Sequence, residues 1–196
     1  METEIEAKFL DIAPDTLRQK LTEIGGQLVH AERQMTRVVL DFPDKKLEKV
    51  GGWVRVRDEG DRITLSYKQL NDRTLHGTKE IETTVGNFET TIKLLEAIGL
   101  ERYSYQETKR EKWQVGDAEV TIDTWPWIPA FAEIEADSET KLKGLAEKLG
   151  LNWADALHGS VEIAYQKYYD ATESEIDNWP KFTFGPIPDW LLAKKR

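Results

Sequence analysis

The chain has 196 residues, of which 39% are hydrophobic and 32% are charged, a length and composition that fit one soluble globular domain. It has no cysteine and three histidines, which excludes disulfides, thiolate metal sites and a cysteine nucleophile, so oxygen atoms would have to hold any metal. Lys and Arg number 27 against 36 Asp and Glu, for a net charge of -9 at pH 7. Such a chain repels nucleic acid unless its cations gather in one place.

The sequence has no apolar run that approaches the roughly 18 residues needed to span a bilayer. Its N-terminus begins with carboxylates and not with a basic and then apolar leader. We therefore expect a cytoplasmic protein that has no membrane partner and no nucleic-acid partner.

The first elements in chain order are a short strand, a helix and two strands. Residues 4–9 alternate in character, which places Glu4, Glu6 and Lys8 on one face of a predicted strand. An amphipathic helix opens at Pro14 and ends at Gly25 and Gly26, because glycine favours helix C-caps. The pattern then predicts strands at about 27–33 and 35–42.

The middle of the chain predicts a hairpin followed by one more strand. Residues 53–57 alternate so that Arg55 and Arg57 share a face, and residues 62–68 alternate again after the charged turn at 58–61. The strand predicted at 78–84 contains Glu80 and Glu82.

The remaining elements are predicted from caps and turns. Asn87 and Ser138 are N-cap residues of two further helices, which end at Gly99 and Gly150. Strands are expected at about 105–115, 118–124 and 131–135. The tail from residue 172 is rich in aromatic residues and proline, and we expect it to run as an extended strap.

These elements predict an α+β fold. About eight strands are expected to close into an eight-stranded antiparallel β-barrel, with the helices packed outside it. Residues 1–171 would form this tunnel domain, and residues 172–196 would be a C-terminal strap of the same domain. A repeated Glu-Ile-Glu sequence, at 4–6, 80–82 and 133–135, suggests a barrel of two similar halves.

The charged strand faces are the candidate functional feature. An ordinary half-buried sheet turns its charges to water, but these faces carry like charges two residues apart, whereas a solubilising surface mixes the two signs. The candidate acids are Glu4, Glu6, Glu80, Glu82, Asp123, Glu133 and Glu135, and the candidate bases are Lys8, Arg55, Arg57, Lys68, Arg110 and Lys167.

A closed barrel would point these faces into a tunnel, where mixed charges require a ligand. Carboxylates coordinate Mg²⁺ or Mn²⁺ through oxygen, and guanidinium and ammonium groups bind phosphate oxygens. The composition of the faces therefore predicts a highly anionic ligand that carries a divalent cation.

The N-terminal Glu4-x-Glu6-x-Lys8 pattern resembles the signature of the CYTH or triphosphate tunnel metalloenzyme superfamily, which includes class IV adenylyl cyclases, thiamine triphosphatases and tripolyphosphatases. The resemblance extends over about residues 1–170. It continues through Arg55-Val56-Arg57, Thr64 to Lys68, Lys109-Arg110, Asp123, Phe131 to Glu135 and Tyr165-Gln166-Lys167.

The resemblance implies a role for each matching residue. The implied metal ligands are Glu4, Glu6, Asp123, Glu133 and Glu135. The implied triphosphate-binding residues are Lys8, Arg55, Arg57, Lys68, Arg110 and Lys167. The implied catalytic set is Glu4, Glu6, Lys8, Arg57 and Lys68, and Glu80 and Glu82 are further tunnel carboxylates that match the family pattern less closely.

The function expected from these residues is metal-dependent hydrolysis of a triphosphate by water activated by Mg²⁺ or Mn²⁺. The substrate would be inorganic tripolyphosphate or a nucleoside or thiamine triphosphate. One alternative is a class IV adenylyl cyclase, which converts ATP to cyclic AMP and diphosphate. Another is a non-catalytic module that binds polyphosphate. The expected partner is a triphosphate-bearing small molecule, and a homodimer is compatible with the sequence.

Overall fold

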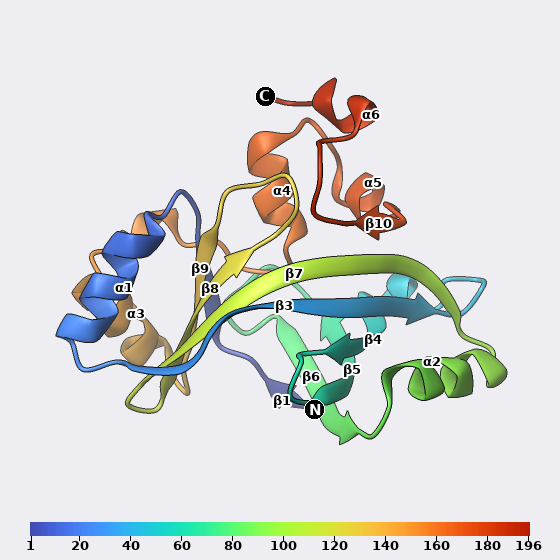
Figure 1. Cartoon of the computed structure of the whole chain (residues 1–196), viewed down its shortest axis with the longest axis horizontal. Coiled ribbons are helices and arrows are strands. Elements are labelled where there is room, and N and C mark those ends of the chain that lie inside the picture. The colour runs from blue at the N-terminus through green and yellow to red at the C-terminus, as the bar shows by residue number, and fades with distance from the viewer.

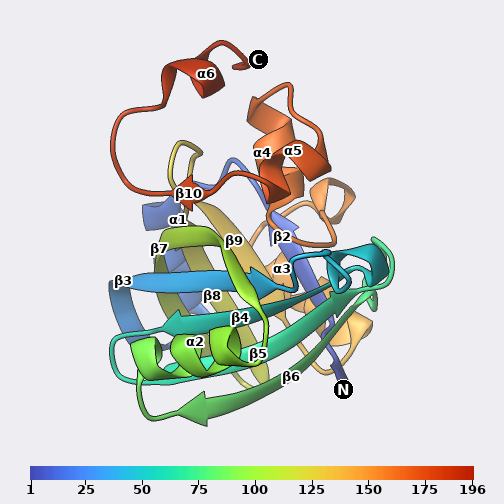
Figure 2. The ribbon, with the colours of Figure 1, turned by 90° about the vertical axis from the view of Figure 1, so that its right-hand side faces the viewer.

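A computed structural model describes residues 1–196, apart from the side chain of Glu2. It confirms the predicted α+β class: a curled antiparallel sheet carries helices on its outer side (Figures 1 and 2). The strands are β1 (Glu2–Thr3), β2 (Glu6–Phe9), β3 (Gln27–Asp41), β4 (Gly52–Asp58), β5 (Ile63–Leu70), β6 (Thr78–Val85), β7 (Glu101–Val115), β8 (Ala118–Thr124), β9 (Phe131–Glu135) and β10 (Lys181–Phe182). The helices are α1 (Pro14–Glu23), η1 (Glu48–Val50), α2 (Phe88–Ala97), α3 (Glu139–Lys148), η2 (Trp153–Asp155), α4 (Glu162–Tyr168), α5 (Glu173–Asp177) and α6 (Asp189–Leu192).

The strand order is β1-β6-β5-β4-β3-β7-β8-β9-β2, so the N-terminal segment meets both ends of the sheet. β1 pairs with β6 and β2 pairs with β9, while Glu4 and Ile5 between them leave the strand ladder. The predicted single strand at 4–9 was therefore wrong. The prediction of a fully closed barrel was wrong as well, because the ladder is interrupted at this point and the sheet is a curled half-barrel.

The two longest strands give the sheet its curvature. The strands predicted separately at 27–33 and 35–42 form one strand, β3, which pairs along most of its length with β7. Register shifts between Leu28 and His30, and between His30 and Arg33, bend this pair without ending it. Figure 1 shows β3 and β7 as long ribbons that cross the middle of the molecule.

The predicted helices α1, α2 and α3 are confirmed, and their caps form as expected. The Asn87 side chain accepts a hydrogen bond from the Thr90 amide at 2.8 Å, and the Ser138 side chain accepts one from the Lys141 amide at 3.4 Å. Each helix packs an apolar stripe against the sheet and leaves its polar side in water.

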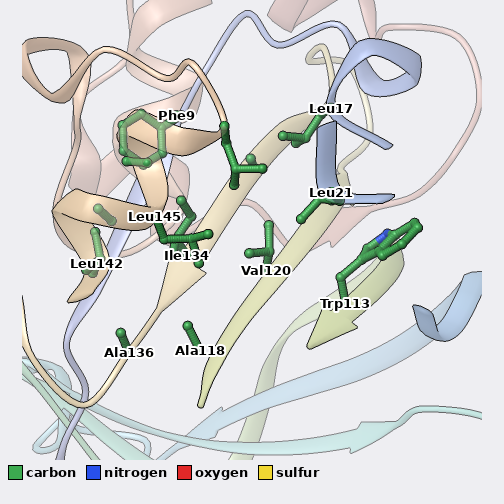
Figure 3. Packing of buried hydrophobic residues seen from close by; sticks show 14 of the residues in the cluster. Phe9, Leu17, Leu21, Trp113, Ala118, Val120, Ile134, Ala136, Leu142 and Leu145 are labelled. Atoms are coloured by element: carbon green, nitrogen blue, oxygen red, sulfur yellow. The ribbon is translucent and has the colours of Figure 1, made fainter. Parts of the chain in front are cut away.

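The hydrophobic core lies outside the curled sheet, between the strands and these helices. Helices α1 and α3 cover β2, β8 and β9 through Leu17, Leu21 and Leu142, which contact Val120 and Ile134 (Figure 3). A second cluster lies between α2 and the outer side of β3 and β4. Because strand side chains alternate, this outer packing leaves the charged residues of the same strands on the inner face.

Residues 172–196 fold into α5, β10 and α6, so this segment is not extended along its whole length. β10 pairs in parallel with β7, and Phe182 is buried in an aromatic cluster with Trp125, Tyr165 and Trp179. Figure 2 shows this segment, in red, at the end of the sheet beside α4. No described helix has the length and apolar composition that a membrane crossing requires.

Candidate active site

The inner face of the sheet encloses a cavity of about 750 Å³ with mainly charged walls. Most of the residues singled out from the sequence lie in these walls, although they come from strands far apart in the chain. The predicted residues that line the cavity are Glu4, Glu6, Lys8, Arg55, Arg57, Lys68, Glu80, Glu82, Arg110, Glu133 and Glu135.

Carboxylates dominate one side, which we call the acidic wall and define as Glu4, Glu6, Glu80, Glu119, Glu133 and Glu135. In the strand register, Glu135 on β9 lies opposite both Glu6 on β2 and Glu119 on β8. Partial burial and the charges of Glu133, Glu119 and Glu6 raise the pKa of Glu135 to about 7. Like charges opposite one another destabilise a sheet. Glu6 is paired with Lys8 and Glu119 with Lys112, whereas Glu135 has no salt bridge among the described residues.

Glu4 and Glu80 form a second carboxylate pair, beside Lys68. The Lys68 Nζ lies 3.0 Å from a Glu4 oxygen and 3.5 Å from a Glu80 oxygen. Burial is the main cause that raises the pKa of Glu4 to about 8, helped by its hydrogen bond to Glu80. Burial also acts on Glu80, but that hydrogen bond and the charges of Lys68 and Arg55 lower its pKa to about 2. The two carboxylates thus share one proton near neutral pH.

Lys8 is the cation at the centre of the acidic wall. Its Nζ lies 2.9 Å from a Glu6 oxygen and 2.8 Å from a Glu133 oxygen. Burial opposes its charge, but Glu133 and Glu6 outweigh burial and hold the pKa of Lys8 above its ordinary value. Lys8 therefore keeps its positive charge inside the cavity.

Guanidinium groups dominate the contiguous strands β4, β3 and β7, and we call Arg37, Arg55, Arg57 and Arg110 the basic wall. Arg55 donates to Glu80 at 3.0 Å and to Glu82 at 3.3 Å. Arg57 lies 2.5 Å from Glu59. Burial, together with the charges of Arg55 and Arg110, lowers the pKa of Arg57 to about 10. Positive charge is in excess in this wall, which adjoins the acidic wall through the Arg55–Glu80 and Arg110–Glu133 contacts.

Asp123 and Lys167 are the two predicted residues that are not among those lining the cavity. Asp123 is buried, and Arg110 donates to its two carboxylate oxygens at 2.6 and 2.8 Å while Thr121 donates at 2.8 Å. Its oxygens therefore fix Arg110 in place. Lys167 is exposed on α4 and is not among the residues that line the cavity.

The cavity also contains residues that sequence reasoning missed. Arg37, Glu119 and Trp125 line it, as does Phe182 from the C-terminal segment. Arg37 lies within the predicted strand at 35–42 and shares a face with the apolar residues Met35 and Val39, so no pair of like charges marked it as a site residue. Phe182 reaches the cavity through the pairing of β10 with β7, which local sequence does not reveal.

The residues of the acidic wall fit a divalent cation in their chemistry. They offer only carboxylate oxygens, and burial together with neighbouring carboxylates keeps protons on Glu4 and Glu135 that a bound cation would displace. Among the described residues, no three carboxylate or imidazole groups are already gathered around one point as metal ligands. The donor set is therefore suitable, while the coordination geometry is not preformed.

Comparison with known families gives a match to the CYTH domain over residues 2–169, so the chain belongs to the CYTH family. Comparison with curated proteins gives no match.

Solved structures share the fold. A protein described as a candidate adenylate cyclase from Vibrio parahaemolyticus is 20% identical, with a TM-score of 0.72, over 84% of this chain and 98% of that one. The PH1012 protein from Pyrococcus horikoshii is 19% identical, with a TM-score of 0.65, over 78% of this chain and 93% of that one. A candidate adenylyl cyclase from Hippeastrum, described as having a dominant triphosphatase activity, is 13% identical, with a TM-score of 0.55, over 90% of this chain and 95% of that one. At these identities the likeness concerns the fold alone.

Proposed function

We propose that the protein is a metal-dependent hydrolase of triphosphate substrates. The observation that supports this most directly is the acidic wall and the basic wall in one cavity, each with an excess of one charge. A triphosphate with a bound divalent cation carries both of the missing charges. The membership of the CYTH family agrees with this reading.

In this proposal, the carboxylates of the cavity bind the metal and its cations bind the phosphates. Glu4, Glu6, Glu133 and Glu135 would hold Mg²⁺ or Mn²⁺, which, when bound, lowers the pKa of a coordinated water and screens the leaving diphosphate. The phosphate-binding residues would be Lys8, Arg55, Arg57, Lys68 and Arg110. Their guanidinium and ammonium groups neutralise the phosphate oxygens as charge develops on them.

Two sequence-predicted residues take different positions in this proposal. Asp123 would act through Arg110, because its oxygens are already engaged by Arg110 and Thr121. Lys167 would need a movement of α4 to reach a phosphate, so it is not part of the proposed phosphate-binding set.

We also propose that residues 1–171 and 172–196 form a single domain. Tyr165 on α4 and Trp125 pack against Trp179 and Phe182 of the C-terminal segment, and all four side chains are buried. A segment that contributes buried aromatic rings and a cavity-lining residue belongs to the folding unit it completes.

A panel of triphosphates tests the proposed function. Inorganic tripolyphosphate, ATP and thiamine triphosphate are each incubated with the protein and Mg²⁺, Mn²⁺ or Ca²⁺, and the released products are measured. We expect metal-dependent release of orthophosphate from at least one of them. Glu4→Gln should lower this rate by about 100-fold or more, because it removes a charge that the proposed metal needs.

The matched control is Glu139→Gln, which makes the same chemical change on α3, away from the cavity. It should leave the rate unchanged. Binding of tripolyphosphate with no turnover of any substrate would instead support the polyphosphate-binding module.

An adenylyl cyclase is the second candidate, because the Vibrio and Hippeastrum neighbours are both described as candidate cyclases, although the Hippeastrum protein is described with a dominant triphosphatase activity. The same cavity could position a ribose hydroxyl for attack on the α-phosphate. Product analysis with ATP separates the two reactions: orthophosphate supports hydrolysis, and cyclic AMP with diphosphate supports cyclisation.

A further inference from the structure

Arg37, at the centre of the basic wall, differs from every other cation of the cavity. Among the described Lys and Arg side chains that line the cavity, it alone has no salt bridge to a carboxylate. Its Nη2 donates to Thr108 Oγ1 at 3.3 Å, and its Nε is shielded from solvent without a hydrogen-bond partner. A guanidinium in this condition still needs an acceptor.

The neighbours of Arg37 make its position electrostatically unfavourable. In the strand register it lies opposite Arg57 on β4 and Gln106 on β7, so it faces one like charge and one neutral amide. Burial and the charges of Arg55, Arg57 and Arg110 lower the pKa of Arg37 well below its ordinary value. The fold thus holds Arg37 among other cations without a salt bridge, and the charge of Asp123 offsets their effect only in part.

The orientation of the guanidinium is fixed by an aromatic ring. The Arg37 Cζ lies 4.4 Å from the centre of the Trp125 ring. Trp125 is itself held by edge contacts with Tyr165 and Phe182, at centroid distances of 6.3 and 6.1 Å. A guanidinium held over a ring in this way can still donate from its N–H groups to a phosphate in a planar, two-pronged hydrogen bond.

We propose that Arg37 binds a phosphate group of the substrate, together with Arg57 and Arg110, at the end of the phosphate chain nearest Trp125 and Phe182. A phosphate there would supply the charged acceptor that Arg37 lacks and would offset the repulsion among the three guanidiniums. The inference rests on the proposed function in taking a phosphate chain as the occupant, and it adds a binding residue and its place in the cavity.

A purely structural role for Arg37 predicts a different set of properties. An arginine kept for stability would be paired with an acid, as Arg33 on the same strand is paired with Asp61 at 2.8 Å. The proposed binding role predicts the opposite behaviour. Removing Arg37 should relieve repulsion in the ligand-free protein, so the melting temperature should stay unchanged or rise while anion binding weakens. Residues that serve binding at the expense of stability show this combination.

The test measures binding of inorganic tripolyphosphate by calorimetry, without added metal and again with Ca²⁺, to the wild type, Arg37→Gln, Arg37→Lys and Arg33→Gln. We expect Kd to rise by about 10-fold or more in Arg37→Gln, because a hydrogen bond between charged groups is lost. Arg37→Lys should recover part of this loss, since lysine keeps the charge without the planar fork. Arg33→Gln, a matched change outside the cavity lining, should alter Kd by less than about twofold.

Melting temperatures of the same ligand-free proteins complete the test. Unchanged tripolyphosphate affinity in Arg37→Gln overturns the inference, and so does an affinity loss in Arg37→Gln that Arg33→Gln reproduces. Because binding is read without turnover, the two proposals fail separately. A wild type that binds tripolyphosphate but hydrolyses nothing contradicts the proposed function alone, whereas a wild type that hydrolyses it while Arg37→Gln binds it as tightly contradicts only the role of Arg37.

Discussion

The two faces of the same strands carry different kinds of side chain: one face is apolar and packed against helices, and the other is charged and lines the cavity. On β9, Ala132 and Ile134 point outward and are fully buried against the helices, while Glu133 and Glu135 point inward to the cavity. On β4 the outward valines alternate with inward arginines in the same way. Adjacent residues thus meet either a well-packed apolar layer or a charged cavity.

The difference shows where the stability of the protein comes from. Burial of apolar side chains on the outer face drives folding, at about 25 cal/mol per Å² removed from water. The inner face contributes less, because its ion pairs must offset the desolvation of both partners and several like charges lie side by side. A sheet stabilised from outside can therefore carry an inner face that is adapted to a ligand.

The largest effect is expected from Ile134→Ala, which changes the outer face of β9 between the candidate site residues Glu133 and Glu135. Ile134 is fully buried among Val120, Leu142 and Leu145. We expect the free energy of unfolding to fall by about 3 kcal/mol, because the substitution leaves a cavity in a packed layer. Urea denaturation measures this change.

The same variant should leave the inner face intact. At a temperature where Ile134→Ala remains folded, its KM for the preferred triphosphate should equal that of the wild type. A changed KM with little loss of stability would show that the two faces are not independent.

Much of this two-faced design is readable from the sequence, because alternation along a strand is a local property. The alternation around Arg55, Glu82 and Glu133 predicted which residues share a face, and the structure places all three in the cavity wall. Helix ends were predictable for the same reason, since caps such as Asn87 and Ser138 act within one turn.

What the sequence did not reveal depends on contacts between distant segments. The break at Glu4 and Ile5 arises because β1 and β2 pair with opposite ends of the sheet, which no local pattern encodes. Arg37 was missed because nothing in the sequence shows that it lacks an acid partner. Lys167 was expected to face the cavity, but it lies near the end of helix α4 and is exposed.

A smaller effect on activity is expected from a change at Asp123, which orients the cation Arg110 on the inner face. In Asp123→Asn, the side chain keeps its size but loses the charge that orients Arg110. We expect kcat/KM for the triphosphate to fall by about 10-fold, because Arg110 then has Glu133, at 3.5 Å, as its remaining partner. Steady-state kinetics checks this value.

Thr121→Val is the companion variant, since it removes the hydroxyl that donates to Asp123 and leaves the charge of Asp123 in place. Its kcat/KM should stay closer to the wild-type value than that of Asp123→Asn. Equal losses in the two variants would mean that packing around Asp123, and not its charge, supports Arg110.

The smallest expected effect concerns acids at the C-terminal edge of the cavity, where Asp177 lies close to Glu162, Glu173 and Glu48. Burial, followed by the charge of Glu162, raises the pKa of Asp177 from 3.8 to about 8. The folded protein therefore holds this proton more tightly than the unfolded chain does. The resulting stabilisation is complete below about pH 4 and is lost as the pH rises through about 8.

Asp177→Asn removes this titration, so its melting temperature should exceed that of the wild type by more at pH 9 than at pH 5. Asp170→Asn makes the same change at an exposed residue and should show no such pH dependence. A difference between Asp177→Asn and the wild type that stays constant from pH 5 to pH 9 would contradict the assignment. It would mean that the excess of like charge is confined to the acidic and basic walls and does not extend to α5.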